Sequence, residues 1–109
     1  MSLADRHCVP CRGGVPPLAG KELSHVYGQL GPGWNLIEKK RLEKEYSFKN
    51  FQDALVFANQ VGKIAEAEGH HPDIHISWGK VRLLIWTHKV GGLTESDFIL
   101  AAKCDQIQK

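Results

Sequence analysis

The stretch IHISWGKVRLLIWTH, residues 74–88, decides the fold of this chain. Apolar residues alternate with other residues on both sides of a Gly79-Lys80 turn, and a period of two is typical of half-buried strands. The return arm divides into two faces, Val81, Leu83, Ile85 and Thr87 on one and Arg82, Leu84, Trp86 and His88 on the other. We therefore expect residues 74–88 to form a β-hairpin.

A long helix is expected just before this hairpin. Asn50 is a favourable N-cap residue, Asp53 lies near the positive end of the helix dipole, and Gly69 suits the C-terminal end. Between them, apolar residues recur at helical spacing. One side of this helix is expected to carry Phe51, Leu55, Ala58, Val61, Ala65 and Glu68, widened by Ala54, Phe57 and Ile64.

Residues 34–48 predict a second hairpin, because two alternating segments flank the basic run Lys39-Lys40-Arg41. Acidic neighbours interrupt that run, so we interpret it as a solvated turn rather than a phosphate-binding patch. A first helix is expected to begin near Leu18 and to end at Gly31-Pro32-Gly33. Its apolar stripe would consist of Leu23, Val26, Tyr27 and Leu30.

The sequence after the first-quoted hairpin predicts one more helix. Gly91-Gly92 breaks the strand, and Thr94 and Asp97 have the spacing of a capping box, with Asp in place of the usual Glu or Gln. The resulting order is α-β-β-α-β-β-α. It predicts an α+β fold in which helices pack on one face of a four-stranded antiparallel sheet.

Size and composition fit one globular domain. The chain has 109 residues, of which 42% are hydrophobic and 24% charged. We expect the domain to span residues 18–109, after a loosely ordered arm over residues 1–17 that is rich in Gly and Pro. A net charge of +2 gives no reason to expect nucleic-acid binding. No apolar run approaches about 18 residues and the first residues lack a signal core, so we expect no membrane insertion and a cytoplasmic protein.

The three cysteines, Cys8, Cys11 and Cys104, are expected to be thiols in that compartment. Cys8 and Cys11 form a CxxC pattern that could be a redox pair or half of a zinc site. No second CxxC follows, and no predicted strand precedes it. We therefore interpret this stretch as an arm without a site.

Six histidines are present, and His70, His71 and His88 stand out by their position. The first two lie between the long helix and the hairpin, and the third lies at the end of the return strand. Because the two ends of a hairpin meet, these histidines could converge at one open edge of the sheet. Imidazoles suit proton transfer near neutral pH, since their unperturbed pKa is about 6.5. A single loop histidine is more often plain polar surface, so the inference depends on convergence.

Two alternatives concern the same region. Three histidines suffice for a catalytic zinc, but adjacent His70 and His71 point in different directions, and Pro72 disfavours the helix that would align His71 with His75. We therefore expect no metal. Asp97 is expected to serve mainly in the capping box with Thr94, and its second interpretation is a carboxylate near His88 that orients or charges an imidazole.

The spacing of the polar residues resembles that of a known family. Glu66, His70-His71-Pro72, Trp78, His88 and Asp97 follow the pattern of the pterin-4a-carbinolamine dehydratases, also called 4a-hydroxytetrahydrobiopterin dehydratases. Further similarities are Trp34 after a glycine, the stretch FKNF at residues 48–51, Thr87 before His88, and the stretch GLT at residues 92–94. The resemblance runs from about residue 18 to residue 107.

The resemblance implies the same α+β fold, homodimers or homotetramers, and a pterin substrate. The implied reaction is dehydration of 4a-hydroxytetrahydrobiopterin to quinonoid dihydropterin and water, which recycles tetrahydrobiopterin for an aromatic amino-acid hydroxylase and needs no cofactor. By the same resemblance His70, His71 and His88 are the catalytic residues, with His70 and His88 as the main acid–base pair. The residues implied in substrate binding are Glu66, Pro72, Trp78, Thr87, Asp97 and Trp34.

A different class of function is compatible with the same fold. Members of this family also act as dimerisation cofactors of a transcription regulator, so the chain could be a non-catalytic binding module or an assembly partner of a pterin enzyme. All three histidines are present here, which favours retained catalysis.

Overall fold

A computed structural model describes residues 3–8 and 16–107 of the chain. In these residues the α-helices and strands follow the predicted order α-β-β-α-β-β-α. Their bounds are α1 Gly20–Tyr27, β1 Asn35–Ile37, β2 Arg41–Ser47, α2 Phe51–Glu68, β3 Asp73–Ser77, β4 Lys80–Ile85 and α3 Glu95–Asp105. Two short 3₁₀ turns span Leu3–Asp5 and His88–Val90.

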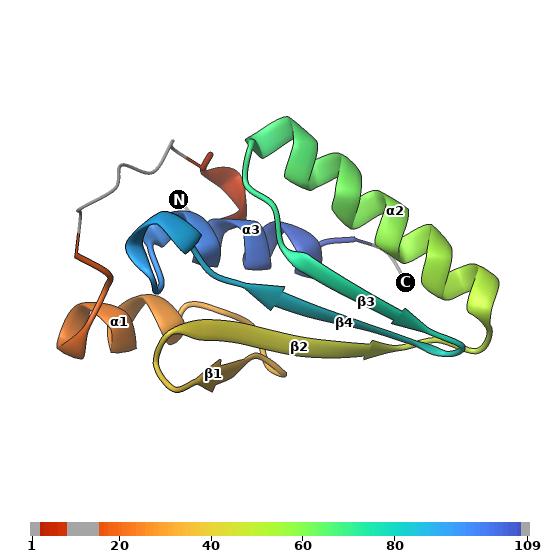
Figure 1. The fold of residues 1–109 in the computed structure, drawn as a ribbon, viewed down its shortest axis with the longest axis horizontal. Helices are drawn as coiled ribbons and strands as arrows, with labels where there is room; N and C mark the ends of the chain where they lie inside the picture. Colours follow the sequence, from red (N-terminus) through yellow and green to blue (C-terminus); the bar gives the residue numbers. More distant parts are fainter. Residues whose placement is uncertain (1–2, 9–15, 108–109) are drawn as a thin grey trace.

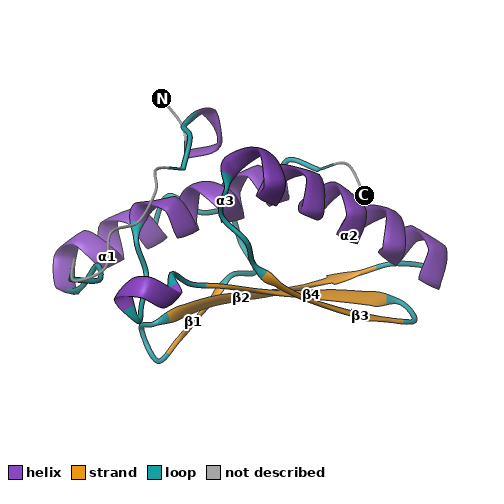
Figure 2. Ribbon diagram, turned by 45° about the horizontal axis from the view of Figure 1, so that its top comes forward, coloured by secondary structure: helices purple, strands orange, loops and turns teal. Residues whose placement is uncertain are grey.

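The four strands form one antiparallel sheet in the order β1-β2-β4-β3 (Figure 1). In the β3–β4 hairpin, Asp73 pairs with Leu84 and Ser77 pairs with Lys80. All three α-helices lie on the same side of the sheet, as Figure 2 shows. The predicted layer architecture is therefore confirmed, and the second face of the sheet carries no helix of the described chain.

The return strand of the hairpin is shorter than predicted. β4 ends at Ile85, and His88 lies in a 3₁₀ turn rather than on the strand. Two bonds close this turn: the backbone N–H of Thr87 donates to the carbonyl of Gly92 at 2.8 Å, and that of Gly92 donates back at 3.4 Å. Gly91 adopts the left-handed conformation, with φ 66°, that lets the chain reverse. The prediction that His88 ends a strand is thus wrong, because β4 ends three residues earlier and the Gly91-Gly92 break folds the chain back onto Thr87.

The predicted ends of α2 are confirmed. The side-chain oxygen of Asn50 accepts the backbone N–H of Asp53 at 2.7 Å, and Gly69 ends the helix at φ 65°. The buried face of α2 consists of Ala54, Phe57, Ala58, Val61 and Ala65. Phe51 and Leu55, which we expected on the same side as Val61, are instead 44% and 38% exposed. The apolar stripe of α2 is wider than the surface that the sheet and α3 can cover.

The first helix is shorter than predicted. α1 spans Gly20–Tyr27 and so begins two residues after Leu18. Its last residues pass into single hydrogen-bonded turns, in which the N–H of Leu30 donates to the carbonyl of Tyr27 at 3.1 Å. Leu23, from the predicted stripe, is buried.

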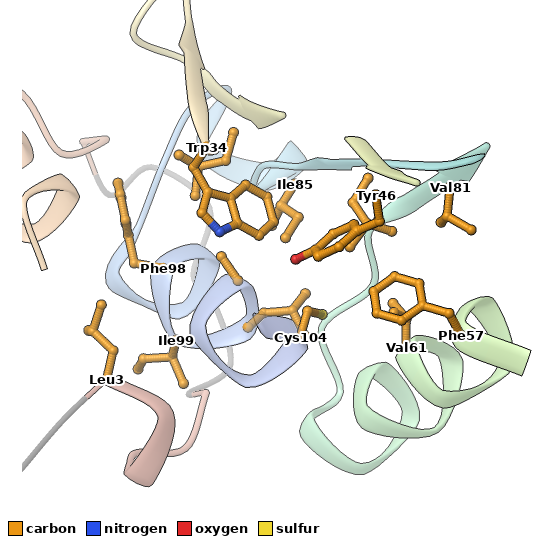
Figure 3. Close-up of a cluster of buried hydrophobic side chains, with 14 of the residues drawn as sticks. Leu3, Trp34, Tyr46, Phe57, Val61, Val81, Ile85, Phe98, Ile99 and Cys104 are labelled. Carbon is orange, nitrogen blue, oxygen red and sulfur yellow. The ribbon is translucent and has the colours of Figure 1, made fainter. Parts of the chain in front are cut away.

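The core lies between the sheet and the helices (Figure 3). Val81 and Ile85 point from β4 toward Phe57 and Val61 of α2 and toward α3. This matches the predicted inner face of the strand. The core residues that the sheet contributes are Leu42, Tyr46, Val81, Leu83 and Ile85, and those of α3 are Phe98, Ile99, Leu100, Ala101 and Cys104.

The described part of the N-terminal arm packs on α3. Leu3 is buried, and the Nζ of Lys103 donates to the carbonyl of Ala4 at 2.9 Å. Farther along, the N–H of Cys8 donates to Glu68 Oε1 at 2.8 Å. Our expectations for residues 9–15, Cys11 among them, lie outside the described residues.

Asp105, at the end of α3, connects the helix to the sheet. Its Oδ2 accepts the indole N–H of Trp34 at 2.8 Å, and its Oδ1 accepts Lys44 Nζ at 2.7 Å and the Tyr46 hydroxyl at 2.6 Å. Burial, followed by the hydrogen bond to Asp105, raises the pKa of Tyr46 far above its usual range. Tyr46 therefore remains a hydroxyl donor at any pH at which the protein is studied.

We expect Asp105→Ala to lower the free energy of unfolding by about 2–4 kcal/mol, because one ammonium and two neutral donors lose the carboxylate that they share. Glu45→Ala is the matched control on β2, since Glu45 pairs with Lys80 at a site where both side chains are at least half exposed. That exposed pair contributes about 0–1 kcal/mol. Equal urea midpoints for the two variants would contradict the proposed role of Asp105.

Candidate active site

The candidate site is built around the buried carboxylate of Asp97, in the first turn of α3. Its Oδ2 accepts the backbone N–H of Thr94 and the hydroxyl of Thr87, each at 2.8 Å. Its Oδ1 lies 2.6 Å from Nε2 of His70. The capping box predicted for Thr94 and Asp97 is present, so one side chain both caps a helix and holds a histidine.

His70 is fixed in one orientation by this contact. A carboxylate can only accept hydrogen bonds, so Nε2 of His70 carries the proton that is donated to Asp97. In the neutral ring Nδ1 is then the basic nitrogen. A carboxylate-backed histidine of this kind is suited to act as a general base.

The structure corrects two expectations about Asp97 and His70. The second interpretation of Asp97 placed its carboxylate near His88, where it would orient an imidazole, but the histidine that it contacts is His70. We also expected the histidines to lie at an open edge, whereas the His70 side chain is only 12% exposed. The reason is the same in both cases: the fully buried carboxylate draws His70 inward.

His71 and His88 have different surroundings. His71 pairs through Nε2 with the carboxylate of Glu66, and both side chains are exposed. His88 is exposed, and its ring stacks on the indole of Trp86 with centroids 4.3 Å apart and planes 16° from parallel. His70 and His71 are thus each held by a carboxylate, one buried and one exposed, whereas His88 is held by an aromatic ring.

The fold brings His70 and His88 to the same end of the sheet. The chain enters β3 just after His70 and leaves β4 just before His88, and these two chain segments lie at one end of the hairpin in Figure 1. Asp97 bonds to both His70 and Thr87, the residue that precedes His88. Convergence of the two segments was the basis of the acid–base hypothesis.

Three other residues implied by the resemblance lie in distinct places. Pro72 is partly buried between His71 and the start of β3. Trp78 lies at the β3–β4 turn, at the opposite end of β3 from His70, and is 69% exposed. Trp34 is only 4% exposed and donates to Asp105. Within one copy of the chain, the hydrogen bonds gather His70, Thr87, Thr94 and Asp97, and they leave Trp78 and Trp34 outside that group.

Sequence reasoning missed two contacts of the site. It did not pair Trp86 with His88, although alternation already placed them on one face of the strand. It also missed Glu68, which binds the arm: Oε1 accepts the N–H of Cys8, while Oε2 lies 3.1 Å from Nδ1 of His7. The hydrogen bond from Cys8 lowers the pKa of Glu68. Since 60 residues separate Cys8 from Glu68, no local pattern could have revealed that contact.

Cys8 and Cys104 are free thiols in the structure. Burial, with a smaller contribution from Glu68, raises the pKa of Cys8 to about 12. Burial likewise raises the pKa of Cys104 to about 12. Both groups are therefore protonated near neutral pH, and neither is an activated nucleophile.

Metal and membrane sites were searched for over residues 3–8 and 16–107. In that part of the chain no three side chains of His, Cys, Asp or Glu cluster as metal ligands would. None of its helices combines the length and apolar character that spanning a membrane requires.

Comparison with known proteins identifies the family. The family model described as pterin 4 alpha carbinolamine dehydratase matches residues 16–107. The chain belongs to the pterin-4a-carbinolamine dehydratase family. The activity that goes with this membership is that of a hydro-lyase.

Individual relatives agree with the family assignment. A protein of Rubrobacter xylanophilus is 50% identical over 105 residues, which cover 96% of this chain and 97% of the relative. A protein of Alkaliphilus metalliredigens is 49% identical over 107 residues, which cover 98% and 96%. Both carry names that assign them provisionally as pterin-4-alpha-carbinolamine dehydratases. A Brucella melitensis crystal structure titled transcriptional coactivator/pterin dehydratase superposes with a TM-score of 0.74 at 28% identity, over 82% of this chain and 95% of that chain.

The contact between His70 and Asp97 has a measurable effect on stability. We expect His70→Ala to lower the free energy of unfolding by about 1–3 kcal/mol, because a fully buried carboxylate loses one of its donors. His75→Ala is the matched control, since His75 is exposed on β3 and its loss should change stability by less than about 0.5 kcal/mol. Urea unfolding measures both variants. Indistinguishable curves would show that the contact contributes nothing in solution.

Proposed function

We propose that the chain dehydrates 4a-hydroxytetrahydrobiopterin to quinonoid dihydropterin and water, with His70 and His88 exchanging protons with the substrate. The observation that carries this proposal is the His70–Asp97 pair. Asp97 also accepts the hydroxyl of Thr87, which is the residue before His88. Family membership supports the reaction. The geometry of the pair supports the assignment of the proton carriers.

The proposed reaction needs two proton transfers. As the C4a–O bond breaks, the hydroxyl oxygen takes a proton and leaves as water. The N5–H bond gives up its proton, and its electron pair forms the C4a–N5 double bond. We assign His70 as the base at N5, because the bond from Nε2 to Asp97 leaves Nδ1 as the nitrogen that can take up the proton. His88 then donates to the leaving oxygen, and exchange with solvent resets both rings.

Other residues would serve around this pair. Thr87 and Thr94 hold Asp97 in place. His71 and Glu66 form an exposed pair next to His70 along the chain, where they would bind the polar edge of a pterin, with Pro72 beside them. Trp34 would act indirectly, by fixing Asp105. No electron is transferred in this scheme, so we propose no cofactor, and the product would be recycled for an aromatic amino-acid hydroxylase.

The alternative is a non-catalytic binding module of the same fold. It would not need a histidine held by a buried carboxylate, nor a second histidine beside it. The three histidines with separate partners favour the enzyme.

The histidine roles are tested by single and double substitution. We expect His70→Ala and His88→Ala each to lower kcat/KM by ~10²–10⁴-fold, the usual contribution of a positioned proton carrier. The double variant should lose clearly less than the product of the two factors, because both act in one step. His75→Ala is the control and should retain the wild-type rate. The measurement is stopped-flow dehydration of 4a-hydroxytetrahydropterin. Wild-type rates in the His70 or His88 variants would refute the assignment.

We also propose that the chain assembles as a homodimer or homotetramer, with a second copy as the occupant of the face formed by α2 and β3. β3 is an edge strand, so its outer backbone groups have no strand partner among the described residues. A groove between α2 and β3 is lined by Ala58, Gly62, Ile74 and Ile76, among others. The exposed apolar residues Phe51, Leu55, Val56, Ile76 and Trp78 belong to these same elements or to the turn that follows β3. A two-fold axis would pair this face with itself and cover its own apolar residues.

Sedimentation analysis tests the assembly. We expect a mass of at least twice the 12.2 kDa of one chain. Ile76→Lys should shift the population toward the monomer, because it places a charge on the apolar face. Lys21→Ala on α1 is the control, since Lys21 lies outside that face, and it should leave the mass unchanged. A wild-type protein that sediments as a 12.2 kDa species would contradict the proposal.

A further inference from the structure

We propose that Trp86 is a positioning residue for His88: its indole holds the imidazole by stacking, and Arg41 in turn restrains the indole. The inference rests on the proposed function of His88 as a proton donor. It adds a residue that lies outside the polar pattern of the family resemblance.

The stacking geometry is close and nearly parallel. The two ring centroids are 4.3 Å apart and the planes differ by 16°. The partners of His70 and His71 instead bond to a ring nitrogen. Among the described residues, no hydrogen bond or ion pair holds the His88 ring, so the indole face is its principal restraint.

Stacking restrains a histidine without using its nitrogens. The proton and the lone pair of an imidazole lie in the plane of the ring, whereas the indole covers only one face of it. Both nitrogens of His88 therefore remain available at the ring edge. A histidine that donates a proton to a substrate oxygen needs both a fixed ring orientation and an accessible ring nitrogen.

The backbone on either side of the stack is fixed independently. Trp86 follows β4 directly and packs against the core. The next residue, Thr87, is held by its backbone pairing with Gly92 and by its hydroxyl bond to Asp97. Trp86 and His88 are two residues apart, and their rings stack face to face beyond the end of β4.

Arg41 completes the arrangement from the neighbouring strand. β2 and β4 pair Leu42 with Ile85, which places Arg41 across from Trp86 at the next position of the ladder. The guanidinium carbon of Arg41 lies 4.9 Å from the centroid of the Trp86 ring, within the range of a cation–π contact. The Trp86 indole thus contacts Arg41 of β2 and, at the same time, stacks on His88 beyond the end of β4.

Proton NMR tests the stack without reference to activity. An indole shields protons above its face, so the carbon-bound ring protons of His88, assigned with His88→Ala, should be shifted upfield in the wild type. Trp86→Leu should remove the shift, Trp86→Phe should keep part of it, and Leu84→Ala, on the same face of β4, should not change it. An unchanged His88 spectrum in Trp86→Leu would show that the stack does not exist in solution.

Stopped-flow kinetics test the positioning role. We expect Trp86→Leu to lower kcat about 3–10-fold with little change in KM, the rate equivalent of one aromatic contact. Trp86→Phe should restore most of the rate, and Arg41→Gln, which leaves the indole in place, should lower kcat less than Trp86→Leu. In the background of His88→Ala, Trp86→Leu should have no further effect. If Trp86→Leu loses the upfield shift of the His88 protons but keeps the wild-type kcat, the positioning role is overturned. Wild-type kcat in His88→Ala would instead refute the function of His88 and leave the NMR result as the test of the stack.

Discussion

A fully buried carboxylate needs hydrogen-bond donors for its lone pairs, and three separate segments supply them to Asp97. It receives a backbone N–H from Thr94 at the start of α3, a hydroxyl from Thr87 after β4, and the Nε2–H of His70 after α2. Removing water from a carboxylate is unfavourable by several kcal/mol unless such donors replace it. The same requirement that caps the helix therefore also draws the α2–β3 segment onto the end of β4. The position of His70 therefore follows from the hydrogen bonds that stabilise the fold.

Asp105 plays a related part at the other end of α3. It gathers an indole, an ammonium and a phenol from the loop before β1 and from β2. The helix is thus joined to the sheet by one carboxylate at each end, with Phe98, Leu100 and Ala101 buried between them. Rigid attachment of α3 matters for the candidate site, because any rotation of the helix would carry Asp97, and with it His70, away from Thr87.

The elements that the sequence predicted well are those governed by local rules. Alternation located both hairpins, and the capping residues Asn50, Gly69 and Thr94 located the helix ends, because each rule depends on residues within four positions of one another. The misplaced features depend on contacts between distant segments. Whether Leu55 faces the core depends on how far α3 extends over α2, and the choice of Asp97 between His70 and His88 depends on the register of β3 against β4. The spaced polar residues still located the candidate site, because its members lie at the ends of elements whose bounds were predicted.

Cys104 is fully buried in the core cluster, and its thiol has a pKa near 12. Thiolates, not thiols, react with alkylating reagents. In the folded molecule the sulfur is therefore unreactive for two reasons: it is buried, and it is protonated. It becomes reactive only in conformations in which α3 has separated from the sheet. The rate at which an alkylating reagent modifies Cys104 under native conditions would consequently report how often α3, the helix that carries Asp97, separates from the sheet.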